Sequence, residues 1–263
     1  MPLAHVGDVR LNYTVQGSGE WLVLIGGYAS SNWQSWGSML TQFATQYKVL
    51  AFDNRGVGES DAPDYPYTTP MLAADVLGLM DHLGIERARI FGKSMGGAIG
   101  QWVALQQPAR VRCLAMSSTT AKLDSRARKM VRWWMDTARD SGFDALFPGE
   151  LTYFYTAEYY DANPEAVARA EQALLSAHRP LRGFLHMGHA LLAHDTWDRL
   201  GDIAAPAFLL CGADDMITPA RHTEAMARRM PNARAVIVPN ALHGVMTERP
   251  ESFGHVLEFL RDH

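Results

Sequence analysis

Short, nearly continuous apolar runs alternate with longer segments of helical period over much of this chain. Four such runs occupy residues 22–25, 49–52, 88–91 and 111–116, and helical segments such as 71–83 and 95–107 lie between them. Unbroken apolar runs are typical of parallel strands that are buried on both faces, and the helices supply the crossover connections. The sequence therefore predicts an α/β fold with a mostly parallel central sheet flanked by helices.

The pattern differs at the start and in the middle of the chain. Residues 3–17 alternate apolar and polar side chains around Gly7-Asp8, which predicts a β-hairpin. Residues 121–200 are helical and rich in aromatics, after which apolar runs return at 207–211 and 235–238. Helical stretches at 219–230 and 250–261 complete the chain. We expect a single domain, with a core of residues 1–120 and 201–263 and a helical cap, 121–200, inserted between two strands.

Bulk properties exclude several classes of function. The 263 residues are 48% hydrophobic and 20% charged, as in a soluble globular protein with a sizeable core. The net charge of −4 contains no long run of one sign, so nothing indicates binding to nucleic acid or an anionic membrane. The chain start lacks signal-peptide features, which favours the cytoplasm. Cys113 and Cys211 lie in apolar runs and are predicted to be buried free thiols. No cofactor is required, and the oligomeric state is not indicated.

A glycine-rich turn joins one of the apolar runs to the helical segment 95–107. Its sequence, Ile90-Phe91-Gly92-Lys93-Ser94-Met95-Gly96-Gly97, contains the pattern G-x-S-x-G. In a sharp strand-to-helix turn, small neighbours let the backbone cross closely and leave the central hydroxyl exposed at the sheet edge. The following helix directs its first N–H groups toward developing negative charge. Ser94 is the predicted nucleophile, although such a turn can also serve only to pack a helix against a sheet.

A serine hydroxyl needs a base to accept its proton, and that base needs a third group to orient it. Among ten histidines, His243 lies just after the last apolar run, at a strand end where catalytic groups gather in open α/β sheets. Asp214 and Asp215 follow the run 207–211 in the same way. The order Ser, Asp, His along the chain suits this arrangement, and either aspartate could be the acid.

Four blocks resemble the α/β-hydrolase superfamily over essentially the whole chain. They are Ile25-Gly26-Gly27-Tyr28, Asp53-Asn54-Arg55-Gly56-Val57-Gly58-Glu59-Ser60, the serine turn, and Gly212-x-x-Asp215-x-x-x-Pro219 followed by His243 and Glu248-Arg249-Pro250-Glu251. The resemblance implies an α/β-hydrolase fold in which Asp215 is the catalytic acid. It also implies an oxyanion hole formed by the backbone N–H groups of Tyr28 and Met95. Asp53 and Arg55 are interpreted as structural residues in the loop below the site.

Two positions depart from the pattern of many relatives. Gly26-Gly27 stands where His-Gly is common, which predicts a more flexible loop around Tyr28. Lys93 stands where His or Asn is common, and its cation either faces outward or tunes the charge of the substrate site. Trp36 is expected to serve in packing.

The cap bears on the choice of substrate. The chain most resembles small carboxylesterases, 3-oxoadipate enol-lactonases and cofactor-free haloperoxidase-like esterases, which carry a helical cap over the active site. Aromatic residues between 130 and 160 predict an apolar lid, with Trp133 or Trp134 as candidates for substrate contact. A basic cluster is interpreted as a solvated helix face, with carboxylate binding as the alternative; it comprises Arg126, Arg128, Lys129 and Arg132. Three nearby histidines lack the further ligands of a metal site; they are His186, His189 and His194.

These features predict a serine hydrolase that cleaves a carboxylic ester or lactone of a small, largely apolar substrate through an acyl-enzyme on Ser94. Carbon–carbon bond hydrolysis and peracid formation use the same three residues and stay open as alternatives. Haloalkane dehalogenation and epoxide hydrolysis are disfavoured, because both need a carboxylate nucleophile at position 94. An alternative of another class is a small-ligand sensor built on a hydrolase scaffold.

Overall fold

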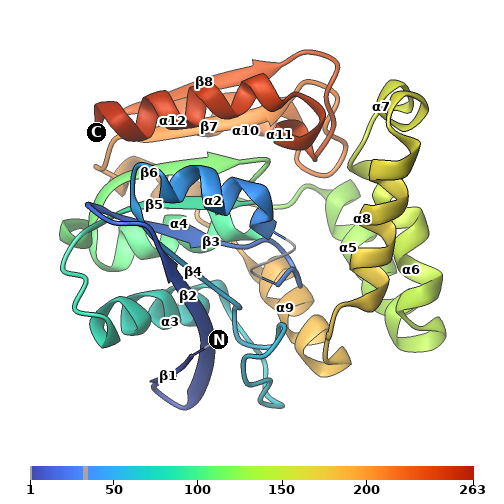
Figure 1. Cartoon of the computed structure of the whole chain (residues 1–263), viewed down its shortest axis with the longest axis horizontal. Coiled ribbons are helices and arrows are strands. Elements are labelled where there is room, and N and C mark those ends of the chain that lie inside the picture. The colour runs from blue at the N-terminus through green and yellow to red at the C-terminus, as the bar shows by residue number, and fades with distance from the viewer. Residues whose placement is uncertain (1, 32–34) are drawn as a thin grey trace.

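The computed structural model describes residues 2–31 and 35–263, and its centre is an eight-stranded sheet (Figure 1). The strands are β1 (Leu3–Val6), β2 (Val9–Gln16), β3 (Trp21–Ile25), β4 (Lys48–Phe52), β5 (Ala88–Lys93), β6 (Val111–Ser117), β7 (Ala207–Gly212) and β8 (Ala233–Val238). Their order across the sheet is β1-β2-β4-β3-β5-β6-β7-β8. β1 and β2 form the predicted hairpin and pair antiparallel, while β3 to β8 are parallel to one another. The prediction of a mostly parallel sheet is confirmed.

Both faces of the sheet are buried, as the unbroken apolar runs predict. In β3, Val23 and Ile25 pack on the face covered by α3 (Thr69–His82), α4 (Met95–Gln106) and α10 (Ala220–Arg229). Leu22 and Leu24 pack on the opposite face, against α2 (Ser38–Ala44) and α12 (Phe253–Asp262). Trp36 is buried on this second face against Phe91. β5 therefore lies in the middle of two apolar layers and ends at the serine turn.

The cap segment emerges between β6 and β7 as a group of helices. They are α5 (Ser125–Ser141), α6 (Phe143–Glu150), α7 (Ala157–Ala162), α8 (Pro164–Ser176) and α9 (Leu181–Ala193). Asp124 caps α5 by accepting from the Ala127 amide, and Gly142, at a φ of 84°, ends it. In Figure 1 the helices α5 to α8 stand beyond the carboxyl ends of the parallel strands. That position places them over the sheet edge where Ser94 lies, and the division at residues 121–200 stays our proposal for the domain organisation.

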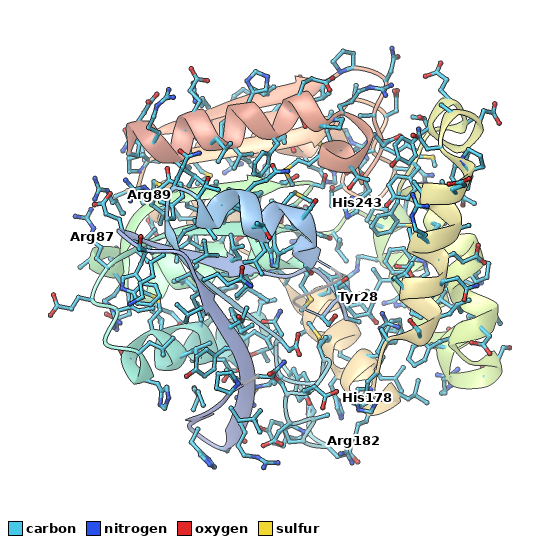
Figure 2. All side chains as sticks on the ribbon, in the orientation of Figure 1. Tyr28, Arg87, Arg89, His178, Arg182 and His243 are labelled. Atoms are coloured by element: carbon cyan, nitrogen blue, oxygen red, sulfur yellow. The ribbon has the colours of Figure 1, made fainter. Side chains whose placement is uncertain are left out.

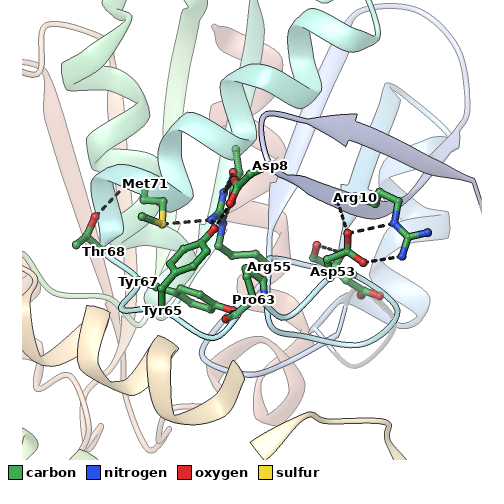
Figure 3. Close-up of polar contacts among 12 residues, drawn as sticks. Asp8, Arg10, Asp53, Arg55, Pro63, Tyr65, Tyr67, Thr68 and Met71 are labelled. Carbon is green, nitrogen blue, oxygen red and sulfur yellow. Dashed lines mark hydrogen bonds and ion pairs between the residues drawn. The ribbon is translucent and has the colours of Figure 1, made fainter. Parts of the chain in front are cut away.

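The loop after β4 forms a buried polar network beneath the cap (Figure 3). Asp53 accepts hydrogen bonds from Asn12 Nδ2 at 2.7 Å and from the Glu59 amide at 3.2 Å. Arg55 pairs with Asp75 through Nε and Nη2, at 2.5 and 2.6 Å from the two carboxylate oxygens. These contacts agree with the structural role predicted for Asp53 and Arg55.

The ends of the chain's last elements differ slightly from the predicted ranges. Pro250–Ser252 forms a 3₁₀ turn, and α12 begins only at Phe253, whereas the sequence predicts one helix from residue 250. A further short helix, α11 (Val245–Glu248), follows His243. Cys113 and Cys211 are buried free thiols. Over residues 2–31 and 35–263, no helix has the length and apolar character needed to traverse a bilayer.

Candidate active site

Ser94 occupies the turn between β5 and α4 in a strained backbone conformation. Its φ of 51° and ψ of −121° lie outside the regions that L-residues ordinarily adopt. The flanking glycines permit the tight crossing, because a Cβ on Gly96 would lie 2.0 Å from the Ile25 carbonyl oxygen. A Cβ on Gly92 would lie 2.3 Å from the Gly96 carbonyl oxygen. The turn therefore presents Ser94 at the carboxyl end of the sheet, as a nucleophile requires.

Ser94, His243 and Asp215 come together although they lie far apart in the sequence. His243 Nε2 lies 3.0 Å from Ser94 Oγ, and His243 Nδ1 lies 2.8 Å from Asp215 Oδ2. Because an ionised carboxylate only accepts hydrogen bonds, Nδ1 carries the proton and donates to Asp215. Nε2 is then left as the acceptor for the Ser94 hydroxyl proton. This is the geometry of a nucleophile, a base and an orienting acid.

The Asp215 carboxylate is fixed by hydrogen bonds from its own turn. Oδ1 accepts from the amides of Ile217 and Thr218 at 2.8 and 2.9 Å, and Oδ2 accepts from Thr218 Oγ1 at 2.8 Å. Burial works to raise the pKa of Asp215, but the neighbouring His243 and these hydrogen bonds lower it below its usual value. Asp215 thus stays ionised beside the histidine. Asp214, the other candidate, forms no such contact with His243 among the described residues.

The loop that carries His243 is held by the cap. The amide of Gly244 donates to the Phe154 carbonyl at 2.9 Å, and the Phe154 ring stands edge-on to the His243 ring with centroids 5.1 Å apart. The buried carboxylate of Glu248 accepts from the amides of Leu242 and Thr156, both at 2.5 Å. One carboxylate therefore ties the histidine loop to the cap segment.

The loop after β3 carries the predicted oxyanion donor and is also tied to the cap. Tyr28 Oη donates to the Phe184 carbonyl of α9 at 2.9 Å, and Arg179 Nε donates to the Ala29 carbonyl at 2.9 Å. Gly27 lies beside the serine turn, since a Cβ there would be in van der Waals contact with Ser94 Cβ at 3.4 Å. Figure 2 shows Tyr28 and His243 on the side of the core that faces the cap. Met95 is the first residue of α4, where backbone N–H groups lack an intrahelical partner.

A cavity of about 380 Å³ lies between the cap and the sheet, and Ser94, His243 and Tyr28 line it. The cap contributes apolar side chains to its remaining wall, including Val131, Trp134, Phe147, Leu151, Phe154, Leu174, Phe184 and Leu191. Trp134 is buried and stacks on Tyr28 with ring centroids 6.2 Å apart, whereas Trp133 is 45% exposed. Of the two tryptophans named from the sequence, Trp134 is the one that faces the cavity.

Three of the four basic residues at the start of α5 are exposed, and none of these four described residues lines the cavity. The fourth, Arg128, donates to the Leu192 carbonyl at 2.5 Å. These positions fit a solvated helix face and do not suit carboxylate binding in the cavity. Lys93 does not face outward: its Nζ donates to the Ser35 carbonyl at 2.7 Å and lies 4.7 Å from the Trp36 ring centroid. Burial lowers the pKa of Lys93 to about 7.

Two of the three cap histidines contact polar side chains through a ring nitrogen. His194 is buried and its Nδ1 lies 3.0 Å from Thr69 Oγ1, while His186 Nε2 lies 2.8 Å from Asp64 Oδ1. Within residues 2–31 and 35–263, no group of three or more histidine, cysteine, aspartate or glutamate side chains is arranged to hold a metal ion.

Two charged residues in the cavity wall were missed by the sequence interpretation. Glu150, the last residue of α6, and Arg179, between α8 and α9, both line the cavity. Burial raises the pKa of Glu150 to about 7, against the lowering effect of the nearby Arg179 and His243 side chains. Neither residue belongs to a motif, and isolated charges in a helical segment ordinarily face solvent. No signal in the sequence marks them.

The chain is similar to hydrolases over its whole length. The sequence profile of the alpha/beta hydrolase fold family matches residues 20–250. The 3-oxoadipate enol-lactonase 2 of Acinetobacter baylyi is 29% identical, and the alignment covers 98% of this chain and 97% of that protein. The protein RutD of Azorhizobium caulinodans, named provisionally as a carbamate hydrolase, is 29% identical with the same coverage of both chains.

A solved structure supports the same conclusion. The crystal structure of the enol-lactonase from Burkholderia xenovorans LB400 superposes with a TM-score of 0.91, at 30% identity, over 99% of this chain and 100% of that one. The match of the family profile and the agreement in fold leave no other assignment: this chain belongs to the alpha/beta hydrolase fold family.

Proposed function

We propose that the protein is a serine hydrolase that cleaves a carboxylic ester or lactone of a small, largely apolar substrate through an acyl-enzyme on Ser94. The observation that carries the proposal is the hydrogen-bonded chain Asp215–His243–Ser94, which ends in an apolar cavity. The names of two similar proteins support the substrate class. One is the enol-lactonase described above, and the other is a thermophilic esterase from Thermogutta terrifontis. The structure of that esterase superposes with a TM-score of 0.90, at 26% identity, over 100% of this chain and 99% of the esterase.

In the first half of the proposed reaction, Ser94 Oγ attacks the carbonyl carbon while His243 Nε2 takes the hydroxyl proton. The carbonyl electron pair moves to the oxygen, and the N–H groups of Tyr28 and Met95 stabilise this oxyanion. When the tetrahedral intermediate collapses, the bond to the alcohol oxygen breaks and His243 returns the proton to that oxygen. Asp215 stabilises the imidazolium that exists between these steps. A lactone would keep its alcohol on the acyl chain.

In the second half, water takes the place of the alcohol. His243 accepts a proton from water as the water oxygen attacks the acyl carbon, and the collapse of the second intermediate returns that proton to Ser94 Oγ. The carboxylic acid product then leaves. The aromatic and aliphatic wall of the cap binds the apolar part of the substrate and keeps other water away from the acyl-enzyme.

The test is hydrolysis of p-nitrophenyl esters, from acetate to octanoate, by the wild type and by Ser94→Ala. We expect kcat to fall on the order of 10³- to 10⁶-fold in the variant. We also expect a pre-steady-state burst of p-nitrophenol equal to the enzyme concentration if hydrolysis of the acyl-enzyme is slow.

Ser252→Ala is the matched control. Ser252 is buried, and its Oγ has no hydrogen-bond partner among the described residues, so the same substitution there leaves the active site intact. Equal turnover by the wild type and Ser94→Ala would refute the assignment of Ser94. Failure of every ester and lactone to turn over, with ligand-dependent thermal stabilisation, would favour the ligand sensor.

A further inference from the structure

Among the described residues, Glu150 is the one carboxylate in the cavity wall, which also carries the cationic side chains of Lys93 and Arg179. It is the last residue of α6, and it lines the same cavity as Ser94 and His243. The side chain forms no hydrogen bond or ion pair with any residue that the structure describes, within residues 2–31 and 35–263. Glu150 is half-buried, and its carboxylate exchanges part of its water shell for the cavity wall without gaining a protein donor, which is unfavourable.

The charged neighbours of Glu150 balance its charge only in part. Arg179 has only 8% of its surface exposed, and its guanidinium is directed at backbone carbonyls: Nε donates to Ala29 at 2.9 Å and Nη1 donates to Leu174 at 3.2 Å. The same guanidinium lies 4.3 Å from the centroid of the Phe147 ring. Arg179 therefore acts on Glu150 through its charge, which works to lower the pKa of that carboxyl group.

From this geometry we propose that Glu150 recognises a hydrogen-bond donor, a hydroxyl or N–H group, on the part of the substrate that lies under the cap. The cavity offers no other carboxylate among its described lining residues, so Glu150 is where a donor group would bind. A donor on the ligand supplies the hydrogen bond that the protein does not, and a charge-assisted hydrogen bond in a water-poor cavity is strong. A carboxylate on the substrate would be repelled.

The inference rests on the proposed ester or lactone hydrolysis and makes it more specific. The substrate becomes an ester or lactone whose acyl part carries a hydroxyl, amide or amine group. A plain alkyl ester leaves Glu150 unsatisfied, and a dicarboxylic half-ester places two negative groups in one cavity. A substrate of this kind differs from a dicarboxylate. The difference depends on the charge of Glu150 and not on the basic residues of α5.

The test compares matched p-nitrophenyl esters of two lengths at pH 8, above the pKa of about 7 to which burial raises Glu150, so that its carboxylate is mostly ionised. The 6-hydroxyhexanoate and 8-hydroxyoctanoate esters carry a donor, the heptanoate and nonanoate esters carry a methyl group of similar size, and the adipate half-ester carries a carboxylate. In Glu150→Leu we expect the ratio of kcat/KM for the hydroxy ester over its methyl partner to fall about 10- to 100-fold at one of the two lengths. The adipate half-ester should be cleaved faster by Glu150→Leu than by the wild type.

Two further variants separate recognition from a general structural effect. Glu150→Gln keeps an uncharged acceptor oxygen at the same place, so its selectivity should lie between that of the wild type and Glu150→Leu. Glu165→Leu removes an exposed glutamate at the start of α8 and should keep the wild-type ratio. An unchanged ratio in Glu150→Leu at both lengths, with hydrolysis still dependent on Ser94, would overturn the inference alone.

A binding measurement makes the inference independent of turnover. Ser94→Ala should be titrated calorimetrically with two pairs of methyl esters: 6-hydroxyhexanoate with heptanoate, and 8-hydroxyoctanoate with nonanoate. At the length that reaches Glu150, the hydroxy ester should bind more tightly than its partner. That preference should be lost in Ser94→Ala/Glu150→Leu. Loss of turnover in all proteins with this preference retained would refute the proposed hydrolysis and leave the donor site standing. No preference in Ser94→Ala at either length would refute the donor site.

Discussion

Replacing Arg55 by methionine should destabilise the fold in a pH-dependent way. Arg55 and Asp75 have side chains only 4% and 5% exposed, and two hydrogen bonds join them. Burial alone would lower the pKa of Arg55, but the hydrogen bonds and charge of Asp75 raise it above its ordinary value. The guanidinium also donates to Tyr65 Oη at 2.5 Å (Figure 3). The substitution therefore leaves a buried carboxylate without its cation.

The size of the effect follows from burial. Removing one partner of a buried ion pair costs about 3–5 kcal/mol of unfolding free energy, because the remaining charge is uncompensated. With an unfolding entropy of about 2.1 cal/mol/K per residue, a chain of 263 residues should lose roughly 5–9 °C in Tm. Burial already raises the pKa of Asp75 with Arg55 beside it, and without Arg55 that pKa rises further. The native state then binds a proton more readily than the unfolded chain, so the variant loses stability as the pH increases.

Thermal unfolding at pH 5 and pH 8 measures both parts of this prediction. The loss in Arg55→Met should be larger at pH 8, and Arg55→Met/Asp75→Leu should recover much of it because no buried charge remains. Arg139→Met is the control, since its ion pairs with Asp136 and Asp140 are exposed and should contribute little. A loss below 2 °C, an equal loss at both pH values, or a double variant no more stable than the single one would refute the reasoning.

Two shorter predictions concern the neighbourhood of Ser94. Tyr28→Phe removes the hydrogen bond from Tyr28 Oη to the Phe184 carbonyl. In denaturant titrations it should lower the unfolding free energy by about 0.5–1.5 kcal/mol. In ester hydrolysis it should reduce kcat more than it raises KM. Lys93→Met should remove a pH dependence of stability. Burial lowers the pKa of Lys93 to about 7, so between pH 7 and pH 10 the unfolded wild type binds more protons than the folded wild type. The unfolding free energy of the wild type should therefore increase as the pH rises. Denaturant titrations across this pH range measure the unfolding free energy. If it changed equally with pH in the wild type and in Lys93→Met, the Lys93 prediction would be contradicted.

The elements that position Ser94 could be predicted because their causes are local. Unbroken apolar runs identify strands buried on both faces, and the close approach of Gly96 to the Ile25 carbonyl explains why small residues surround the serine. The positions of His243 and Asp215 follow from a general property of parallel sheets, whose strand ends meet at one edge. The distances of 3.0 Å from His243 Nε2 to Ser94 Oγ and of 2.8 Å from His243 Nδ1 to Asp215 Oδ2 agree with the expected arrangement. The catalytic roles of these residues stay a prediction.

The cavity wall could not be predicted in the same way, because it depends on how cap helices pack on one another. Glu150 and Arg179 are separated by a turn and two helices, and only the packed structure shows that both face the cavity. Trp133 and Trp134 are adjacent in sequence, yet one is 45% exposed and the other is buried against Tyr28. The interaction of Lys93 with the Ser35 carbonyl has no signal in the sequence either, because it joins the end of β5 to a residue 58 positions earlier in the chain.

The contacts of the cap show that it does more than cover the cavity. The Phe184 carbonyl and Arg179 hold the loop that carries Tyr28, and the Phe154 carbonyl holds the loop that carries His243. In two of these three contacts the cap contributes a backbone carbonyl, of Phe184 or Phe154, so no particular side chain is needed at those two cap positions. Side chains that line the cavity, other than Arg179, can therefore change while the cap continues to hold both loops. Apart from Arg179, which both lines the cavity and holds the loop after β3, the cavity wall and the contacts that hold these loops thus use different atoms of the cap.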